Sequence, residues 1–391
     1  MTFSIWHQSV GRDARVDVAI IGGGISGLSA AHWIRARRPQ ARIHIFERGR
    51  LGSGASGRNA GFMTCGSIAH FDRHVHNLGL DDALALWTLT QRNHAELLAA
   101  GFLSEACGYR QTGAYSLSRS TDTLHALSAS AAALQHAGAD VRVLPSDGAP
   151  LPGYEGGYWY GGDGQLNPMG LMAAFRERQA ATLHEGTEVL EVESTADGIE
   201  LRTSLGTWRA RVLIVATNGY TPQWIPQLTP WVSPTRAQAL STVPAKGRLD
   251  APVYALDDWA YLRQTEDGAL VLGGFRPLAA DEERGVEDRI HPGIHAALDD
   301  YLRAHCGPLF DGDAQVTHRW SGVLGYAPDA LPIVGEIPSI PHGYFIGAHS
   351  GHGMGWGFIA ARLLTALVFD GARPGPLDSR RFGGRPDEAT D

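Results

Sequence analysis

Two short β-branched runs near the start of the chain predict buried strands of a parallel sheet. One covers residues 16–21 and the other residues 43–46. Apolar runs without polar alternation are typical of strands that are covered on both faces. Residues 28–38, between them, have a helical pattern that Pro39 ends. The order strand, helix, strand predicts a βαβ unit and an α/β fold.

The turn between the first strand and this helix carries a glycine pattern that suits a dinucleotide. Gly22, Gly24 and Gly27 follow the spacing G-x-G-x-x-G. These glycines allow a tight turn, a close pyrophosphate and close helix packing, while the helix N-terminus attracts phosphates. Glu47 follows the second strand. A carboxylate at this position accepts hydrogen bonds from both hydroxyls of the adenosine ribose and disfavours a 2′-phosphate. We expect a bound dinucleotide other than NADP; a plain glycine-rich turn is the alternative.

The rest of the chain is predicted as alternating helices, strands and loops. The segment 51–62 is glycine-rich and is expected to be a loop, and the tail after Gly371 is expected to be loosely ordered. Helical patterns occupy 81–100, 121–136, 167–181, 291–306 and 359–369, and strand patterns occupy 113–118, 188–194, 198–204, 210–216, 260–263 and 269–274.

Composition and charge narrow the class of protein. A chain of 391 residues with 43% hydrophobic residues can bury a large core. A net charge of −8 without a basic block argues against nucleic acid as a partner. Three distant cysteines, Cys65, Cys107 and Cys306, predict a reducing compartment. The first fifteen residues lack a signal peptide's apolar region, and no apolar run reaches the roughly 18 residues of a membrane span. We therefore expect a cytoplasmic protein without a membrane span.

Five segments stand in order along the chain: 16–47, GASGRNAGF at 54–62, VATNGYTP at 215–222, APDALPIVG at 327–335 and GAHSGHGM at 347–354. Together they resemble the D-amino-acid oxidase superfamily of FAD enzymes, which includes glycine oxidase, sarcosine oxidase and γ-glutamylputrescine oxidase. The variant SGRNAG at 56–61 and SIWHQSV at 4–10 are most similar to the γ-glutamylputrescine oxidase-like branch.

The resemblance implies a discontinuous Rossmann-like FAD-binding domain and an α+β substrate domain built on an antiparallel sheet. The expected FAD-binding domain comprises residues 1–80, 160–222 and 322–391, and the expected substrate domain comprises residues 81–159 and 223–321. The residues that the resemblance implies for FAD binding are Gly22, Gly24, Ile25, Ser26, Gly27, Glu47, Arg48, Ser56, Gly57, Arg58, Asn59, Ala60, Gly61, Val189, Ala216, Thr217, Gly351, His352, Gly353 and Met354.

Two departures from the superfamily pattern bear on the cofactor and on oxygen. The stretch HRWSGVLGYAPD has no cysteine where sarcosine oxidase-like members attach FAD, so the expected FAD is non-covalent. Those members also carry a lysine over the flavin that promotes reaction with oxygen. The matching strand here, LVLG at 270–273, has Val271 in that position. We expect His352, Arg58 or Arg276 to substitute for that cation.

The candidate substrate residues lie in the expected substrate domain. Arg263 in AYLRQ and Arg276 in GGFRP suit a bidentate contact with a carboxylate, although each is as readily a structural ion pair. Tyr261 and Trp320 are pocket walls or core aromatics. No metal is expected at the nearby pair His349 and His352, because no acidic residue or cysteine accompanies them.

The implied reaction is oxidation of an amine or amino acid. A hydride passes from the α-carbon to the flavin, and the imine product hydrolyses, with oxygen as the expected electron acceptor. The alternatives are a dehydrogenase that passes electrons to a quinone or a protein, a flavin subunit of a larger complex, and a plain NAD dehydrogenase. The last of these leaves the segments at 56–61 and 347–354 without a role.

Overall fold

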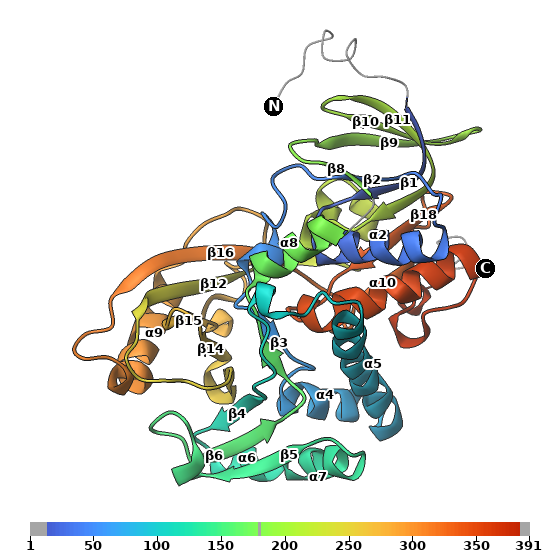
Figure 1. Ribbon diagram of the computed structural model, residues 1–391. Coiled ribbons are helices and arrows are strands. Elements are labelled where there is room, and N and C mark those ends of the chain that lie inside the picture. The colour runs from blue at the N-terminus through green and yellow to red at the C-terminus, as the bar shows by residue number, and fades with distance from the viewer. Residues whose placement is uncertain (1–13, 179–180, 384–391) are drawn as a thin grey trace. The chain divides into compact units, whose positions relative to one another are not determined.

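The computed structural model describes residues 14–178 and 181–383, which divide into two compact units (Figure 1). Unit 1 joins residues up to 57 with 172–235 and the chain from 323, and unit 2 joins 58–171 with 236–322. Unit 2 also contains two segments that we expect from the sequence to belong to the FAD-binding domain, residues 58–80 and 160–171. The assignment of cofactor and substrate to separate domains stays a prediction. The motif SIWHQSV lies outside the described residues.

Unit 1 is built on a mainly parallel sheet. The strands follow the order β17-β18-β11-β1-β2-β8, and β9 and β10 extend the sheet from β11 as an antiparallel hairpin. Ile20 in the central strand pairs with Ile214 on one side and Ile45 on the other, so the apolar runs meet in register. The bounds are β1 Ala14–Ile21, β2 Ile43–Phe46, β8 Thr182–His184, β9 Val189–Thr195, β10 Gly198–Thr203, β11 Gly206–Val215, β17 Ile333–Glu336 and β18 Gly343–Gly347.

Helices α2 (Ile25–Arg37) and α10 (Gly353–Asp370) pack against each other in unit 1 (Figure 1). Their contact is close at Gly357, where a Cβ would lie 2.9 Å from Cγ1 of Ile25. Among the described residues, α10 is the one helix that is long and apolar enough to span a membrane, but 61% of it is buried inside the protein. Burial of this kind is typical of a core helix, which accounts for its composition.

Unit 2 is built on a second, mostly antiparallel sheet. The strand order is β16-β12-β15-β14-β13-β4-β6-β5, and β13 and β4 run parallel. The two-stranded pair β3 (Phe62–Met63) and β7 (Gly164–Gln165) lies apart from this sheet. The bounds are β4 Ala114–Ser118, β5 Val141–Pro145, β6 Gly156–Tyr160, β12 Ser233–Pro244, β13 Val253–Ala255, β14 Ala260–Gln264, β15 Ala269–Gly273 and β16 Val316–Tyr326. The α/β fold with an antiparallel second sheet is thus confirmed.

The structure differs from the sequence expectations at several other places, among them the unpredicted helix at 68–78 and the start of the last helix at Gly353 instead of residue 359. The expected loop at 51–62 contains a short helix, α3 (Ala55–Arg58). The expected helix at 121–136 is broken at Leu127. The tail through Phe382 is held by ion pairs of Arg373 with Asp378 and Glu336, so it is not loose. The other helices are α4 Ile68–Leu78, α5 Leu80–Ala99, α6 Thr121–Ala126, α7 Ser128–His136, α8 Pro168–Arg178 and α9 Pro292–Tyr301.

Candidate functional site

The residues predicted to bind the cofactor in unit 1 follow the carboxyl ends of its parallel strands. Gly22 follows β1, Glu47 follows β2, Ala216 and Thr217 follow β11, and the turn that begins at Ala348 follows β18. Parallel strands present their carboxyl ends at one edge of a sheet, which is where α/β folds bind ligands. The sheet order therefore brings together residues that lie more than 300 positions apart.

The first turn of α2 is shaped to receive a phosphate. Gly24 is the N-cap residue and has no side chain with which to cap the helix, and no acidic residue lies in the first turn. Such a terminus leaves backbone N–H groups without helical partners. Ile25 N–H donates to Ser56 Oγ at 2.9 Å, and a Cβ on Gly24 would lie 2.8 Å from the same oxygen. Ser56 and Gly24 thus form a narrow cradle that fits a pyrophosphate against backbone.

Glu47 is fixed beside this turn. Its Oε2 accepts a hydrogen bond from Gly23 N–H at 2.8 Å, and its Oε1 accepts one from Gly49 N–H at 2.8 Å. Oε1 also accepts a long hydrogen bond from Ser53 Oγ at 3.5 Å, whereas Oε2 keeps a second lone pair that can accept a hydrogen bond from a ribose hydroxyl. The guanidinium of Arg48 lies 4.8 Å from the ring centre of Tyr220.

The turn after β18 is joined to α2 by a buried hydrogen bond. Ser26 Oγ and His349 Nε2 are 2.7 Å apart, while His349 Nδ1 is buried without a hydrogen-bond partner. Burial lowers the pKa of His349 to about 4, so the ring is neutral at pH 7. The neighbouring His352 is the N-cap of α10, and Gly353 and Met354 open that helix without a side-chain cap. The structure therefore brings 351–354 next to the first turn of α2.

The other predicted cofactor contacts of unit 1 also lie at the sheet. Ala216 N–H donates to Ile21 O at 2.8 Å, which holds the end of β11 against β1. The hydroxyls of Thr217 and Thr221 are 2.7 Å apart. Val189 begins β9 and pairs with Thr203 of β10.

In unit 2, the predicted cofactor loop 58–61 is held at its backbone by two strands. Trp320 Nε1 of β16 donates to Arg58 O at 2.8 Å, and Arg263 Nε of β14 donates to Ala60 O. Asn59 Oδ1 accepts from Gly61 N–H at 2.8 Å. Trp320 is thus more than a pocket wall, because its indole N–H fixes the loop.

The Arg58 side chain is fixed as well. Its Nη1 donates to Asp288 Oδ2 at 2.8 Å and to Ser321 O at 2.9 Å. Ser321 Oγ donates to Asp288 Oδ1 at 2.8 Å. Burial raises the pKa of Asp288, but the hydrogen bonds from Ser321 and Arg58 outweigh it, so the pKa lies below its ordinary value. Asp288 is therefore ionised when it holds Arg58.

Arg263 is a buried cation without an ionic partner in the described part of the chain. Its side chain is 6% exposed, and its one hydrogen bond there is the contact with Ala60. Desolvation, followed by the nearby charge of Arg110, lowers its pKa to about 10. Arg263 also pairs with Val271 across β14 and β15. Directly paired residues point to the same face of a sheet. Arg263 therefore lies beside Val271, the position at which the superfamily pattern would have a lysine.

The remaining catalytic candidates are less constrained. Tyr261 pairs with Gly273, and its ring lies 5.9 Å from that of Phe62 in an edge-to-face arrangement. Arg276 begins a 3₁₀ turn directly after β15 and its strand-end glycines.

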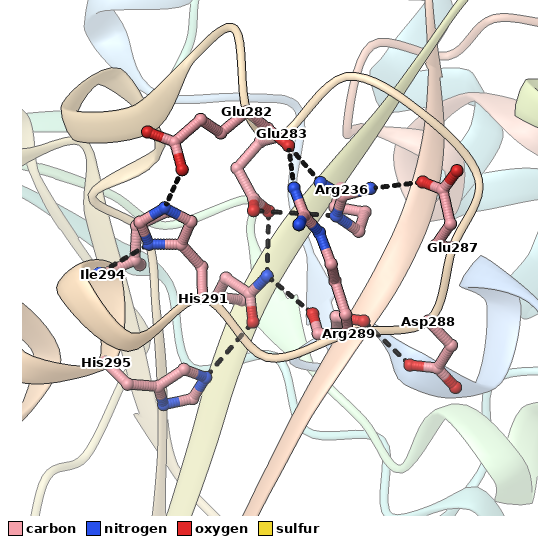
Figure 2. A network of polar contacts seen from close by, with 11 residues as sticks. Arg236, Glu282, Glu283, Glu287, Asp288, Arg289, His291, Ile294 and His295 are labelled. Carbon is pink, nitrogen blue, oxygen red and sulfur yellow. Dashed lines mark hydrogen bonds and ion pairs between the residues drawn. The ribbon is translucent and has the colours of Figure 1, made fainter.

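The segment 281–291 that carries Asp288 is anchored by the network in Figure 2. Arg236 of β12, wholly buried, forms ion pairs with Glu283 at 3.6 Å and Glu287 at 2.9 Å. Gln238 Nε2 donates to Glu283 Oε2 at 2.8 Å, and its Oε1 lies 3.2 Å from His295 Nε2. The sequence carries no local signal for Asp288 or for this anchor, because the partners lie 33 or more positions apart and match no local motif.

The family model for FAD dependent oxidoreductases matches residues 17–367. A probable oxidoreductase OrdL from Rhizobium meliloti is 27% identical over 87% of this chain and 80% of its own length. Glycine oxidase from Geobacillus kaustophilus is 27% identical over 91% of this chain and 92% of its own. Its crystal structure covers 95% of this chain and 100% of its own, with a TM-score of 0.78. The gamma-glutamylputrescine oxidoreductase of Escherichia coli is 25% identical over 90% of this chain and 83% of its own length.

The chain belongs to this FAD dependent oxidoreductase family, the D-amino-acid oxidase superfamily that the sequence motifs indicate. It is an FAD-dependent oxidoreductase. The cradle of Gly24 and Ser56 and the placement of Glu47 fit this cofactor, and the chain has no cysteine in 317–329 for covalent attachment.

Proposed function

We propose that this protein oxidises an amine or an amino acid at its C–N bond. FAD, when bound, accepts the hydride from the carbon next to nitrogen. The nitrogen lone pair forms the C=N bond as the hydride leaves, and the nitrogen loses a proton to solvent. Water then hydrolyses the imine to a carbonyl compound and an amine or ammonia. Relatives named for glycine and gamma-glutamylputrescine support this substrate class.

Arg263 is the residue on which the proposal for substrate binding depends. The guanidinium of Arg263 is 6% exposed and has no ion pair among the described residues, and the more distant charges of Glu266 and Asp267 only partly offset its burial, so a bound anion would stabilise it. The carboxylate of an amino acid would supply that charge in the bidentate geometry that arginine prefers. Arg263 thus binds and orients the substrate through its carboxylate.

We propose oxygen as the electron acceptor. The charge of Arg263 stands opposite Val271 and supports this proposal, since a cation favours the electron transfer that forms superoxide. A dehydrogenase with a quinone or protein acceptor is the second candidate, and Val271 in place of a lysine favours it. We also propose a cytoplasmic location, which the three free cysteines support.

An anaerobic spectrum tests both parts of the proposal. The purified holoenzyme is mixed with amines and amino acids without air, and then air is admitted. We expect one class of amine or amino acid to bleach the flavin absorption band, and we expect the band to return rapidly in air. Slow recovery would instead favour the dehydrogenase. A yellow protein that no amine bleaches would contradict amine oxidation.

Two variants test the role of Arg263. Arg263→Gln is expected to raise KM for an amino acid by roughly tenfold or more, because a charge-assisted contact contributes about 1.5–3 kcal/mol. Arg248→Gln, which alters an exposed arginine paired with Asp250, serves as the control. The KM of an amine without a carboxylate should not change in either variant. Equal KM values for an amino acid in both variants would exclude Arg263 as its partner.

A further inference from the structure

A buried group of three metal-ligating side chains lies in unit 2, apart from the residues assigned to FAD or substrate. Cys65 follows β3, His94 lies in α5, and Asp163 lies between β6 and β7. One ligand atom from each lies within 4.8 Å of the others. His94 and Asp163 are 7% and 1% exposed, and the thiol of Cys65 is buried although part of that residue reaches the surface.

His94 is held as metal-binding histidines are. Its Nδ1 lies 2.7 Å from Thr90 O, so Nδ1 carries the proton and donates it to this carbonyl. Its Nε2 is buried without a hydrogen-bond partner. A ring N–H bound to a carbonyl fixes the ring and leaves the other nitrogen as a ligand. The Met63 carbonyl also approaches the ring and acts to raise its pKa, but it makes no hydrogen bond of good geometry with Nε2 in the described part of the chain.

The other two ligands are also fixed by backbone contacts. Asp163 Oδ1 accepts from Cys65 N–H at 2.8 Å, and Asp163 O accepts from Gly113 N–H at 2.9 Å. Burial raises the pKa values of the Asp163 carboxyl and the Cys65 thiol well above their ordinary values. The Cys65 thiol is hydrogen-bonded to the Asp163 carboxylate, and the hydroxyls of Thr90 and Tyr160 face the same sulfur. A divalent cation would offset the desolvation of all these groups at once.

Space for a further ligand adjoins the cluster. Asp163 lines a small cavity together with Trp87, Tyr160 and Tyr254. The indole Nε1 of Trp87 is also buried without a hydrogen-bond partner. A water in this cavity would accept the Trp87 N–H and lie on the Asp163 side of the cluster.

We propose that Cys65, His94 and Asp163 form a structural binding site for Zn²⁺ within unit 2. Thiolate, imidazole and carboxylate are the three ligand types that Zn²⁺ takes in proteins, and four-coordinate geometry is its usual choice. Binding releases the thiol proton and any proton on Asp163 to solvent, and no electrons are transferred. The cation ties the loop after β3 to the middle of α5 and to the β6–β7 connection.

Metal analysis of the FAD-loaded enzyme tests this site. The enzyme is produced with added Zn²⁺ and dialysed, and zinc is measured together with flavin. About one zinc per chain is expected, as for a single closed site. Most of the zinc should be lost in each of three variants, Cys65→Ser, His94→Gln and Asp163→Asn. Cys306→Ser, which alters another buried cysteine of unit 2, should retain it.

A measurement on the unchanged protein covers the case in which the variants do not fold. Enzyme produced with Co²⁺ should show a tetrahedral ligand-field band to the red of the flavin absorption. X-ray absorption at the zinc edge should show one sulfur at about 2.3 Å. Wild-type enzyme that takes up neither Zn²⁺ nor Co²⁺ under anaerobic, reducing conditions would overturn the proposal. Zinc that persists in folded Cys65→Ser protein, or that has no sulfur ligand, would overturn it equally.

Discussion

Gly27 packs against the backbone of the turn that precedes its own helix. A Cβ at this position would lie 2.0 Å from Gly22 O and 3.2 Å from Cγ2 of Ile20. Neither neighbour can move without displacing β1, because Ile20 is wholly buried between two paired strands. The absence of a side chain at Gly27 therefore sets where the phosphate-binding turn lies.

Gly27→Ala is expected to destabilise the fold by about 1–3 kcal/mol or more, since overpacked backbone must shift. Because the shift would move the first turn of α2, the purified variant should also lose most of its FAD. Thermal unfolding and the ratio of flavin to protein absorbance measure the two effects. Gly307→Ala is the control, since nothing lies within 4 Å of the added Cβ. Retention of full flavin in Gly27→Ala would contradict this account of the turn.

Trp320→Phe removes the indole N–H that holds Arg58 O and keeps an aromatic ring in place. If the loop 58–61 contacts FAD, the loss of one hydrogen bond of about 0.5–1.5 kcal/mol should weaken FAD binding roughly two- to tenfold. Fluorescence titration of the apoprotein measures this. Trp259→Phe, at a tryptophan that is 51% exposed, should leave FAD affinity unchanged. Equal affinities in the two variants would show that the loop position does not depend on Trp320.

At the scale of elements, the segment 281–291 is held by the ion pairs of the buried Arg236 with Glu283 and Glu287. Glu283→Gln would leave Arg236 with only the exposed Glu287 as an ionic partner, so the cost should approach the roughly 3–5 kcal/mol of a broken buried pair without exceeding it. Asp311→Asn removes the acid of the exposed pair with Lys246 and should cost less than about 1 kcal/mol. Urea unfolding compares the two. Similar free energies of unfolding for the two variants would mean that other contacts hold the segment 281–291.

The turn after β18 should make stability depend on pH through His349. The folded protein holds the pKa of His349 at about 4 by burial, whereas an unfolded histidine titrates near ~6.5. The unfolded state therefore binds more protons between these values, so stability falls as the pH falls through this window. Thermodynamic linkage predicts that the free energy of unfolding falls by about 2 kcal/mol between pH 7 and pH 5.

Urea unfolding at pH 7 and pH 5 measures this loss. His349→Gln should shrink the difference between the two pH values by most of that amount, whereas His136→Gln, at an exposed position of α7, should leave it as in the wild type. A pH dependence that is the same in both variants would exclude His349 as its source.

Local sequence signals account for the first βαβ unit and for the residues after its strands. Gly22, Gly24, Gly27 and Glu47 act through short-range geometry, so their spacing alone predicts where they lie. Arg58, Trp320 and Asp288 meet only through pairing across the second sheet and its loops, which no local period encodes. The helix at 68–78 was missed, although Ser67 and His70 form a reciprocal cap at its start, because histidine replaces the usual Glu or Gln.

For the whole molecule, the strand order of unit 1 has a consequence for synthesis on the ribosome. Strand β11 lies between β1, near the start of the chain, and β18, which ends at Gly347. Domains generally fold as units as the chain emerges. Unit 2 is complete once residue 322 has been made, whereas unit 1 still lacks its last two strands and α10. Strand β10 already pairs with β11 over residues 206–210, but residues 213–215 of β11 lack their β18 partners until residue 347 has been made, so the sheet of unit 1 cannot close before then.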